Sequence, residues 1–311
     1  MSGGVMKMQA LIENVFVLIF FAFAGWFLGT RHILSSQNSK LLSVLEIWVF
    51  LPCNMLKSFS KNFTLSYFQE KYPLIILSAC LVVSLMLLNA FLVPKFVKGK
   101  YQQNVLRYSL TAPNYGYVGY PLIQSVYGDL MLLNAQVFAI PMSVYTSSEG
   151  YRLLTNGDSV SLKKIINPTL VAIIVGATLG LTGVQLPNVV NTIIANGSSC
   201  MGPISMLLAG ITISDYDIKE LLRNKTSYIV TLFRLLLIPL TLCVILKSFV
   251  SKDILMIVVL IYCMPCGLNT IVFPKMIGED CRPGASMAMI STVACLVTIP
   301  LCMQILEWIA G

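Results

Sequence analysis

Two proline-interrupted segments of this chain carry the residue types that could bind a small anion. The first covers residues 112–121 and reads APNYGYVGYP, and the second covers residues 264–269 and reads MPCGLN. A proline inside a helix removes a backbone hydrogen bond and clashes with the preceding turn, and glycine loosens the backbone further. Each break therefore starts a new half-helix, whose N-terminus has free N–H groups and roughly half a positive charge. A carboxylate is the type of ligand that such an end binds.

Two asparagines and several tyrosines add polar side chains to these breaks. We expect the amides of Asn114 and Asn269 to bind the anion together with backbone N–H groups, and the tyrosines to line the pocket. The expected substrate-binding residues are Asn114, Pro113, Tyr115, Gly116, Gly119, Pro121, Pro265, Cys266, Gly267 and Asn269. Two simpler interpretations stay open: the prolines only kink helices, and the tyrosines only pack or anchor the chain at the membrane interface.

The composition indicates which kind of element positions these breaks. Of the 311 residues, 57% are apolar and 11% are charged, and the mean hydropathy is +0.81. A soluble domain typically has about 25% charged residues. A soluble fold could not cover so much apolar surface, which excludes a soluble enzyme, a disordered chain and a nucleic-acid-binding protein. The sequence therefore predicts a multi-pass protein of the lipid bilayer.

Apolar runs that could cross a bilayer recur along the whole chain. A transmembrane helix needs roughly 20 apolar residues. We identify ten such runs, at residues 9–29, 39–59, 72–94, 104–127, 131–154, 167–184, 188–213, 226–248, 253–275 and 284–309. The expected fold is thus all-α, with ten transmembrane helices, of which spans 4 and 9 are broken.

The first five spans and the last five share the placement of their prolines. Spans 4 and 9 each have a mid-span proline, a second proline eight or nine residues later and a glycine-acid turn, while Pro141 and Pro300 occupy similar places in spans 5 and 10. Because five is odd, the second copy must be inverted relative to the first, as is typical of secondary transporters. The expected repeats are residues 1–154 and 167–311, joined by a cytoplasmic loop at 155–166. If the two breaks cross, their positive ends converge near the membrane midplane.

Basic residues predict the orientation of the chain in the cell membrane. With an external N-terminus, most of the 21 lysines and arginines fall in internal loops, which is the distribution that membrane proteins favour. Both termini are therefore expected outside. The nine cysteines lie nearly all in apolar runs and His32 is the only histidine, so we expect no disulfide framework, no metal site and no enzyme activity.

Arg234 lies within the eighth expected span, where a charge is costly. One interpretation is that it attracts an anionic substrate. The favoured interpretation is a structural ion pair with Glu149, which should lie at a similar depth in span 5. Glu46 and Glu13 lie nearer to span ends, so we expect them to reach the membrane surface or to cap helices.

Residues 114–122, NYGYVGYPL, resemble the Asn-x-Gly-x-x-Gly-x-Pro-Leu segment of the auxin efflux carrier family, and residues 265–269, 278–280 and 298–300 resemble its C-terminal half. The resemblance covers essentially the whole chain. It implies two inverted five-helix halves, a homodimer, a scaffold of spans 1, 2, 6 and 7, and a mobile transport domain of spans 3, 4, 5, 8, 9 and 10. It also implies that Asn114 and the breaks at Pro113 and Pro265 contact a substrate carboxylate.

The same resemblance narrows the expected function. Plant members of the family export auxin, and bacterial members carry malate and related acids; the short 155–166 connection resembles the bacterial branch. We expect a secondary active transporter of a small organic anion, a mono- or dicarboxylate such as malate or an auxin-like acid, with an elevator-type mechanism. A sodium-coupled symporter of the bile-acid symporter type and a channel are the alternatives. No cofactor is expected, and the coupling ion, if there is one, is H⁺ or Na⁺. Span 3 lacks the acidic residue that plant members carry, so their coupling does not transfer directly to this chain.

Overall fold

Helices make up almost all of the computed structural model, which describes residues 2–34, 36–157 and 168–310. Most of the expected 155–166 connection, with Asp158, Lys163 and Lys164, lies outside the described residues. The elements before it are α1 (Ser2–Thr30), α2 (Ser36–Leu45), η1 (Glu46–Phe50), α3 (Leu51–Asn62), α4 (Leu65–Phe96), α5 (Lys100–Thr111), η2 (Tyr115–Gly119), α6 (Tyr120–Phe138), α7 (Ile140–Tyr145), η3 (Thr146–Gly150) and α8 (Tyr151–Leu154), where η denotes a π-helical turn.

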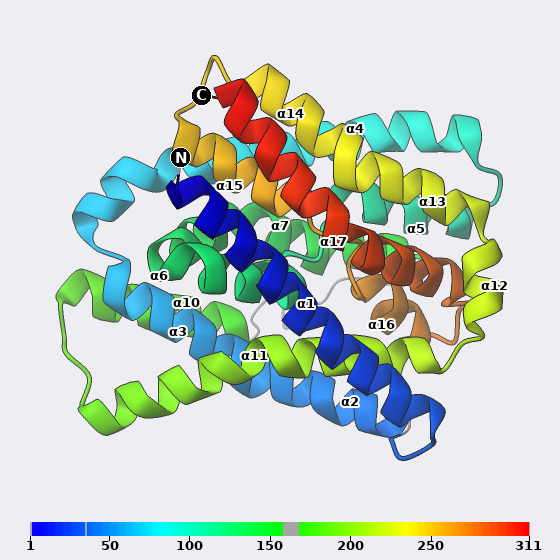
Figure 1. Cartoon of the computed structure of the whole chain (residues 1–311), viewed down its shortest axis with the longest axis horizontal. Coiled ribbons are helices and arrows are strands. Elements are labelled where there is room, and N and C mark those ends of the chain that lie inside the picture. The colour runs from blue at the N-terminus through cyan, green and yellow to red at the C-terminus, as the bar shows by residue number, and fades with distance from the viewer. Residues whose placement is uncertain (1, 35, 158–167, 311) are drawn as a thin grey trace.

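The second part of the chain is built in the same way. Its elements are α10 (Pro168–Thr182), α11 (Asn188–Ser214), α12 (Ile218–Arg223), α13 (Lys225–Leu232), η4 (Phe233–Leu237), α14 (Ile238–Leu246), α15 (Lys252–Tyr262), α16 (Asn269–Met276) and α17 (Arg282–Ala310). In Figure 1, α1 and α17 run diagonally side by side, and the two chain ends lie at the same edge of the view.

Three of the π-helical turns are followed by a proline at the second position of the next helix. Pro52, Pro121 and Pro239 follow η1, η2 and η4. In each case the residue before the proline donates its N–H to a carbonyl five residues back, as Tyr120 does to Tyr115. Because proline has no N–H to continue the α-helical pattern, the turn before it widens.

Glycines allow two helix pairs to approach closely. Helix α1 lies along α11, and α3 lies along α10 and contacts α11 (Figure 1). A Cβ atom added at Gly210 of α11 would lie 1.9 Å from the Ala22 carbonyl oxygen, and one at Gly25 of α1 would lie 2.2 Å from the Leu207 oxygen. Small residues at helix interfaces are the common device for close packing in membranes. These contacts hold α1, α3, α10 and α11 in one group.

The number of unbroken spans is smaller than the sequence predicts. Among the residues that the structure describes, six helices are long and apolar enough to cross a membrane, or up to seven if the pair Tyr115–Phe138 and Ile140–Leu154, bent by 46°, counts as one span. Spans 4 and 9 are interrupted as expected, and α10 has only 15 residues. Gly128 has φ 82° and ψ −179°, which breaks the helical geometry of α6 at the turn expected between spans 4 and 5.

Replacing Gly210 with alanine should destabilise the fold, because the added methyl group would meet backbone atoms that cannot move independently. Overpacking of this kind costs about 1–3 kcal/mol. We expect a clear drop in the thermal unfolding midpoint in detergent. Gly116→Ala is the matched control, because a Cβ there would meet nothing within 4 Å. Equal midpoints for the two variants would contradict the close packing of α1 on α11.

Candidate functional site

The two broken segments lie against each other. Residues 112–114 separate α5 from η2, and residues 263–268 separate α15 from α16. Pro113 and Cys266 pair as an isolated antiparallel bridge, and the N–H of Asn114 donates to the Pro265 carbonyl at 2.8 Å. Segments about 150 residues apart in the sequence thus meet at their prolines. We call this meeting point of residues 112–114 and 263–268 the crossing.

Side chains from two other helices form hydrogen bonds with backbone groups that the breaks leave unpaired. The N–H of Cys266 donates to Ser291 Oγ of α17 at 2.9 Å. Arg234 of η4 donates to the Leu110 carbonyl at 3.2 Å and to the Met264 carbonyl at 3.4 Å. These two carbonyls lie at the C-terminal ends of α5 and α15, where a helix has unpaired carbonyls and partial negative charge. Arg234 therefore caps both half-helices that end at the crossing.

The half-helices that begin at the crossing are not capped in this way. Within the part of the chain that the structure describes, the backbone N–H groups of Tyr115, Gly116, Gly267 and Leu268 have no hydrogen-bond partner. Asn114 precedes η2 and makes no side-chain capping bond to it. Two positive helix ends therefore face the crossing with free donors, as an anion site requires.

The two asparagines differ in their surroundings. Asn114 is 4% exposed, and its amide makes no hydrogen bond to any described residue. Asn269 is half-buried, and its Nδ2 donates to the Tyr108 hydroxyl at 2.9 Å. The structure thus leaves the Asn114 amide free for a ligand, while Asn269 is held by Tyr108.

The other residues expected at the site divide into those beside open space and those packed against protein. Open space lies beside Gly116, because a Cβ built there meets nothing within 4 Å. A Cβ at Gly119 would lie 3.3 Å from Met264, and Pro121 packs against Gly202 of α11. The Tyr115 hydroxyl lies 2.9 Å from Ser143 Oγ, and its ring lies beside Tyr120. Gly119 and Pro121 therefore shape the crossing, and Gly116 borders its free volume.

The predicted ion pair between Arg234 and Glu149 is wrong. Glu149 accepts two hydrogen bonds from Arg152, three residues further along the same helical stretch. Arg234 is fully buried, and its guanidinium lies 5.4 Å from the Tyr262 ring centroid in addition to its two carbonyl contacts. The prediction failed because depth in a span does not say which side of the helix faces the crossing.

The expectation for Glu46 is also wrong. Glu46 is 0% exposed, and Ser205 Oγ of α11 lies 2.7 Å from its Oε1. It does not reach a membrane surface. Its place seven residues inside an apolar run was the signal for a buried position. No sequence pattern marked Ser291 or Tyr108 as partners of the crossing.

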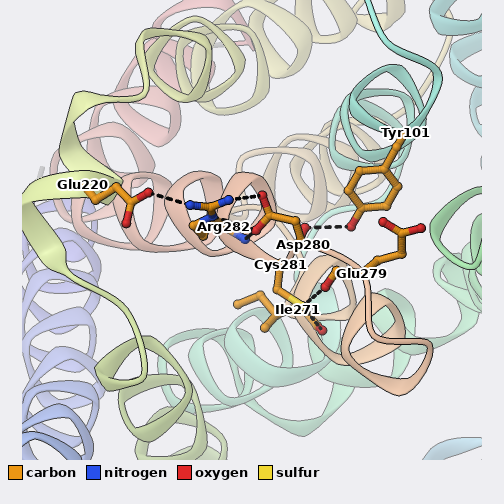
Figure 2. A network of polar contacts seen from close by, with 7 residues as sticks. All are labelled: Tyr101, Glu220, Ile271, Glu279, Asp280, Cys281 and Arg282. Carbon is orange, nitrogen blue, oxygen red and sulfur yellow. Dashed lines mark hydrogen bonds and ion pairs between the residues drawn. The ribbon is translucent and has the colours of Figure 1, made fainter.

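A second polar cluster lies at the start of α17, as Figure 2 shows. Arg282 pairs with Asp280 and with Glu220 of α12, each at 2.9 Å, and the Tyr101 hydroxyl of α5 donates to the Asp280 carbonyl at 3.0 Å. The hydrogen bonds from Arg282 lower the pKa of the Asp280 carboxyl. An open cavity of about 300 Å³ lies beside Arg282 and Glu220. Three of its charged groups, Arg282, Asp280 and Glu220, already pair with each other, so we place the candidate site at the crossing.

Comparison with known proteins identifies the family. A family model for membrane transport proteins (Mem_trans) matches twice, at residues 10–155 and at residues 151–303. The chain belongs to this membrane transport protein family. It is therefore a membrane transporter, related to the auxin efflux carriers, and not an enzyme. Two matches of one model to the two halves show an internal duplication.

Relatives in two distant organisms cover nearly the whole chain. This chain is 25% identical over 305 residues to the uncharacterized transporter MJ1031 of Methanocaldococcus jannaschii, and the alignment covers 93% of this chain and 97% of that protein. It is 21% identical over 307 residues to the uncharacterized transporter YfdV of Escherichia coli K12, covering 93% and 96%. The similarity extends over both halves, so the two breaks lie inside the shared region.

Replacing Arg234 with leucine should destabilise this transporter. The change leaves the Leu110 and Met264 carbonyls without a donor in apolar surroundings, at about 1–3 kcal/mol for each unsatisfied group. We expect a lower unfolding midpoint in detergent. Arg152→Gln is the matched control, because it removes an exposed ion pair worth about 0–1 kcal/mol. A midpoint for Arg234→Leu as high as that of the control would show that Arg234 does not cap the half-helices.

Proposed function

We propose that this protein is a secondary active transporter of a small organic anion, a mono- or dicarboxylate such as malate or an auxin-like acid. The observation that carries the proposal is the crossing itself. Two half-helix N-termini with free N–H groups, the unpaired Asn114 amide and the open space beside Gly116 lie together there. A carboxylate would accept hydrogen bonds from these donors and neutralise the partial positive charge of both helix ends.

The proposed transport mechanism needs ten spans and two parts that move relative to each other. We propose that the broken elements complete spans 4 and 9, so that each half of the duplicated chain forms a five-helix repeat of inverted orientation. The packing of α1, α3, α10 and α11 supports a scaffold made of spans 1, 2, 6 and 7. The other spans would carry the crossing across the membrane as a transport domain, within a homodimer whose chain ends face the outside of the cell.

A sodium-coupled symporter of the bile-acid symporter type is the second candidate. Unwound carbonyls at crossed half-helices can coordinate Na⁺ in transporters of this kind. At this crossing, however, the Leu110 and Met264 carbonyls already accept hydrogen bonds from Arg234. A malate flux that follows an imposed sodium gradient and ignores pH would favour this candidate. A channel would instead show single-channel currents under voltage clamp.

Replacing Asn114 with alanine should abolish most malate flux into proteoliposomes. A hydrogen bond to a charged group contributes about 1.5–3 kcal/mol, which corresponds to about a ten-fold or greater loss of affinity. Asn191→Ala is the control, because Asn191 bonds the Leu186 carbonyl near the start of α11. Unchanged flux in Asn114→Ala would show that the anion binds elsewhere. Other organic acids can be compared with malate by thermal shift, since a bound ligand raises the unfolding midpoint.

Replacing Gly116 with leucine should block the site without breaking the helix. The added side chain would occupy the open space beside η2, where the anion is proposed to bind. We expect malate to lose its effect on the unfolding midpoint, while the midpoint without malate changes little. Gly116→Ala should keep part of the ligand effect, because it fills less of the space. A full malate shift in Gly116→Leu would contradict this placement of the substrate.

A further inference from the structure

Glu46 is a buried acid without a cationic partner among the described side chains. It is the first residue of η1, it is 0% exposed, and its Oε2 is enclosed without any hydrogen-bond partner in the described structure. Burying an ionised carboxylate away from water is very costly unless a cation and hydrogen bonds compensate it. The described ion pairs do not involve Glu46: Lys57 of α3 pairs with Asp129 at 3.3 Å.

The hydrogen bonds of Ser205 indicate where a proton lies. Ser205 Oγ is 2.7 Å from Glu46 Oε1 and 2.6 Å from the Met201 carbonyl oxygen. A serine hydroxyl has one proton to donate, and a carbonyl can only accept. If the hydroxyl donates to Met201, the second short contact needs a proton from Glu46. This arrangement fits a neutral carboxylic acid that donates to Ser205.

The groups around Glu46 belong to both parts of the proposed transporter. The phenol of Tyr117, in η2 at the crossing, lies close enough to Glu46 for an electrostatic interaction. Four other elements pack against η1. In α3 the Cys53 thiol lies against Gly197 and Lys57 faces Asp129, while Cys200 of α11 is exposed and α10 carries no titratable side chain. The titratable residue of α2 is Lys40, whose side chain lies outside the described part of the structure. Helix η2 packs on α11, which carries Ser205, and Pro121 at the start of α6 touches Gly202 of the same helix. The half-helix that begins at the crossing therefore packs against the helix that carries Ser205, the hydrogen-bond partner of Glu46.

We propose that Glu46 is a proton-binding site that couples H⁺ movement to transport. While η2 packs against α11 as in this structure, the carboxyl group is enclosed and neutral. When η2 moves along α11, water reaches the group, its O–H bond breaks and the proton passes to water. This proposal rests on the proposed function for the movement of η2, whereas the protonation of Glu46 in the covered state does not.

Infrared difference spectroscopy of the protein in lipid vesicles at neutral pH tests the protonation. The wild-type spectrum should contain the C=O band of a protonated carboxyl group, and Glu46→Gln should lose it. Glutamine keeps the size of the side chain and an acceptor for Ser205, so the fold should persist. Glu70→Gln removes a side chain that is 70% exposed and should keep the band. Wild-type and Glu46→Gln spectra without a difference in this band would overturn the proposal.

Transport in proteoliposomes tests the coupling, with malate as the probe. In the wild type a proton gradient should drive malate accumulation, and Glu46→Gln should lose this response while still exchanging malate for malate. A full response to the proton gradient in Glu46→Gln, or accumulation driven by sodium instead, would overturn the coupling role. An absence of malate movement in the wild type would contradict the proposed substrate, while the infrared comparison would still decide whether Glu46 is protonated.

Discussion

The structure depends on one constraint: polar backbone groups released by prolines inside the bilayer must find partners within the protein. Pro113 and Pro265 interrupt two helices at the same place and leave carbonyls on one side of each break and N–H groups on the other. The two segments satisfy part of this demand for each other through the bond from Asn114 to Pro265. Arg234 satisfies the carbonyl ends. The N–H groups of Tyr115 and Gly267 have no partner among the described residues. The carbonyl side of each break is therefore capped, while the N–H side is open.

The same constraint accounts for the places of three polar or charged residues. Glu46, Tyr115 and Arg234 each lie within a π-helical turn that is followed by a proline. Because a π-helical turn has a wider hydrogen-bond pattern, it shifts the side chains of that turn relative to a regular helix. The turns thus supply a local reason why these three side chains point toward the protein interior. Each π-helical turn before a proline therefore also positions a polar side chain.

The breaks could be predicted from the sequence because proline and glycine act on their own backbone. The apolar runs likewise predicted the helices, and the paired prolines predicted the duplication that the family matches show. The partner of Arg234 could not be predicted, since it depends on how η4 is rotated toward α5 and α15. Glu149 has Arg152 on its own helical turn, a local partner that the search for a distant one overlooked. Ser291 lies in an unremarkable stretch of α17, and only the fold brings it to Cys266.

The balance of charge at the crossing bears on what it could bind. Arg234 is fully buried, and the partners it has are neutral carbonyls and an aromatic ring rather than a carboxylate. Its positive charge offsets the partial negative charge of the two helix C-termini that it caps, so the two half-helix N-termini leave a positive potential within a few residues of Asn114. In a medium of low dielectric constant this potential attracts an anion and repels a sodium ion, unless an acid compensates it. Glu46 would compensate it only when ionised, so in our proposal the proton on Glu46 and the anion at the crossing are linked by the same field.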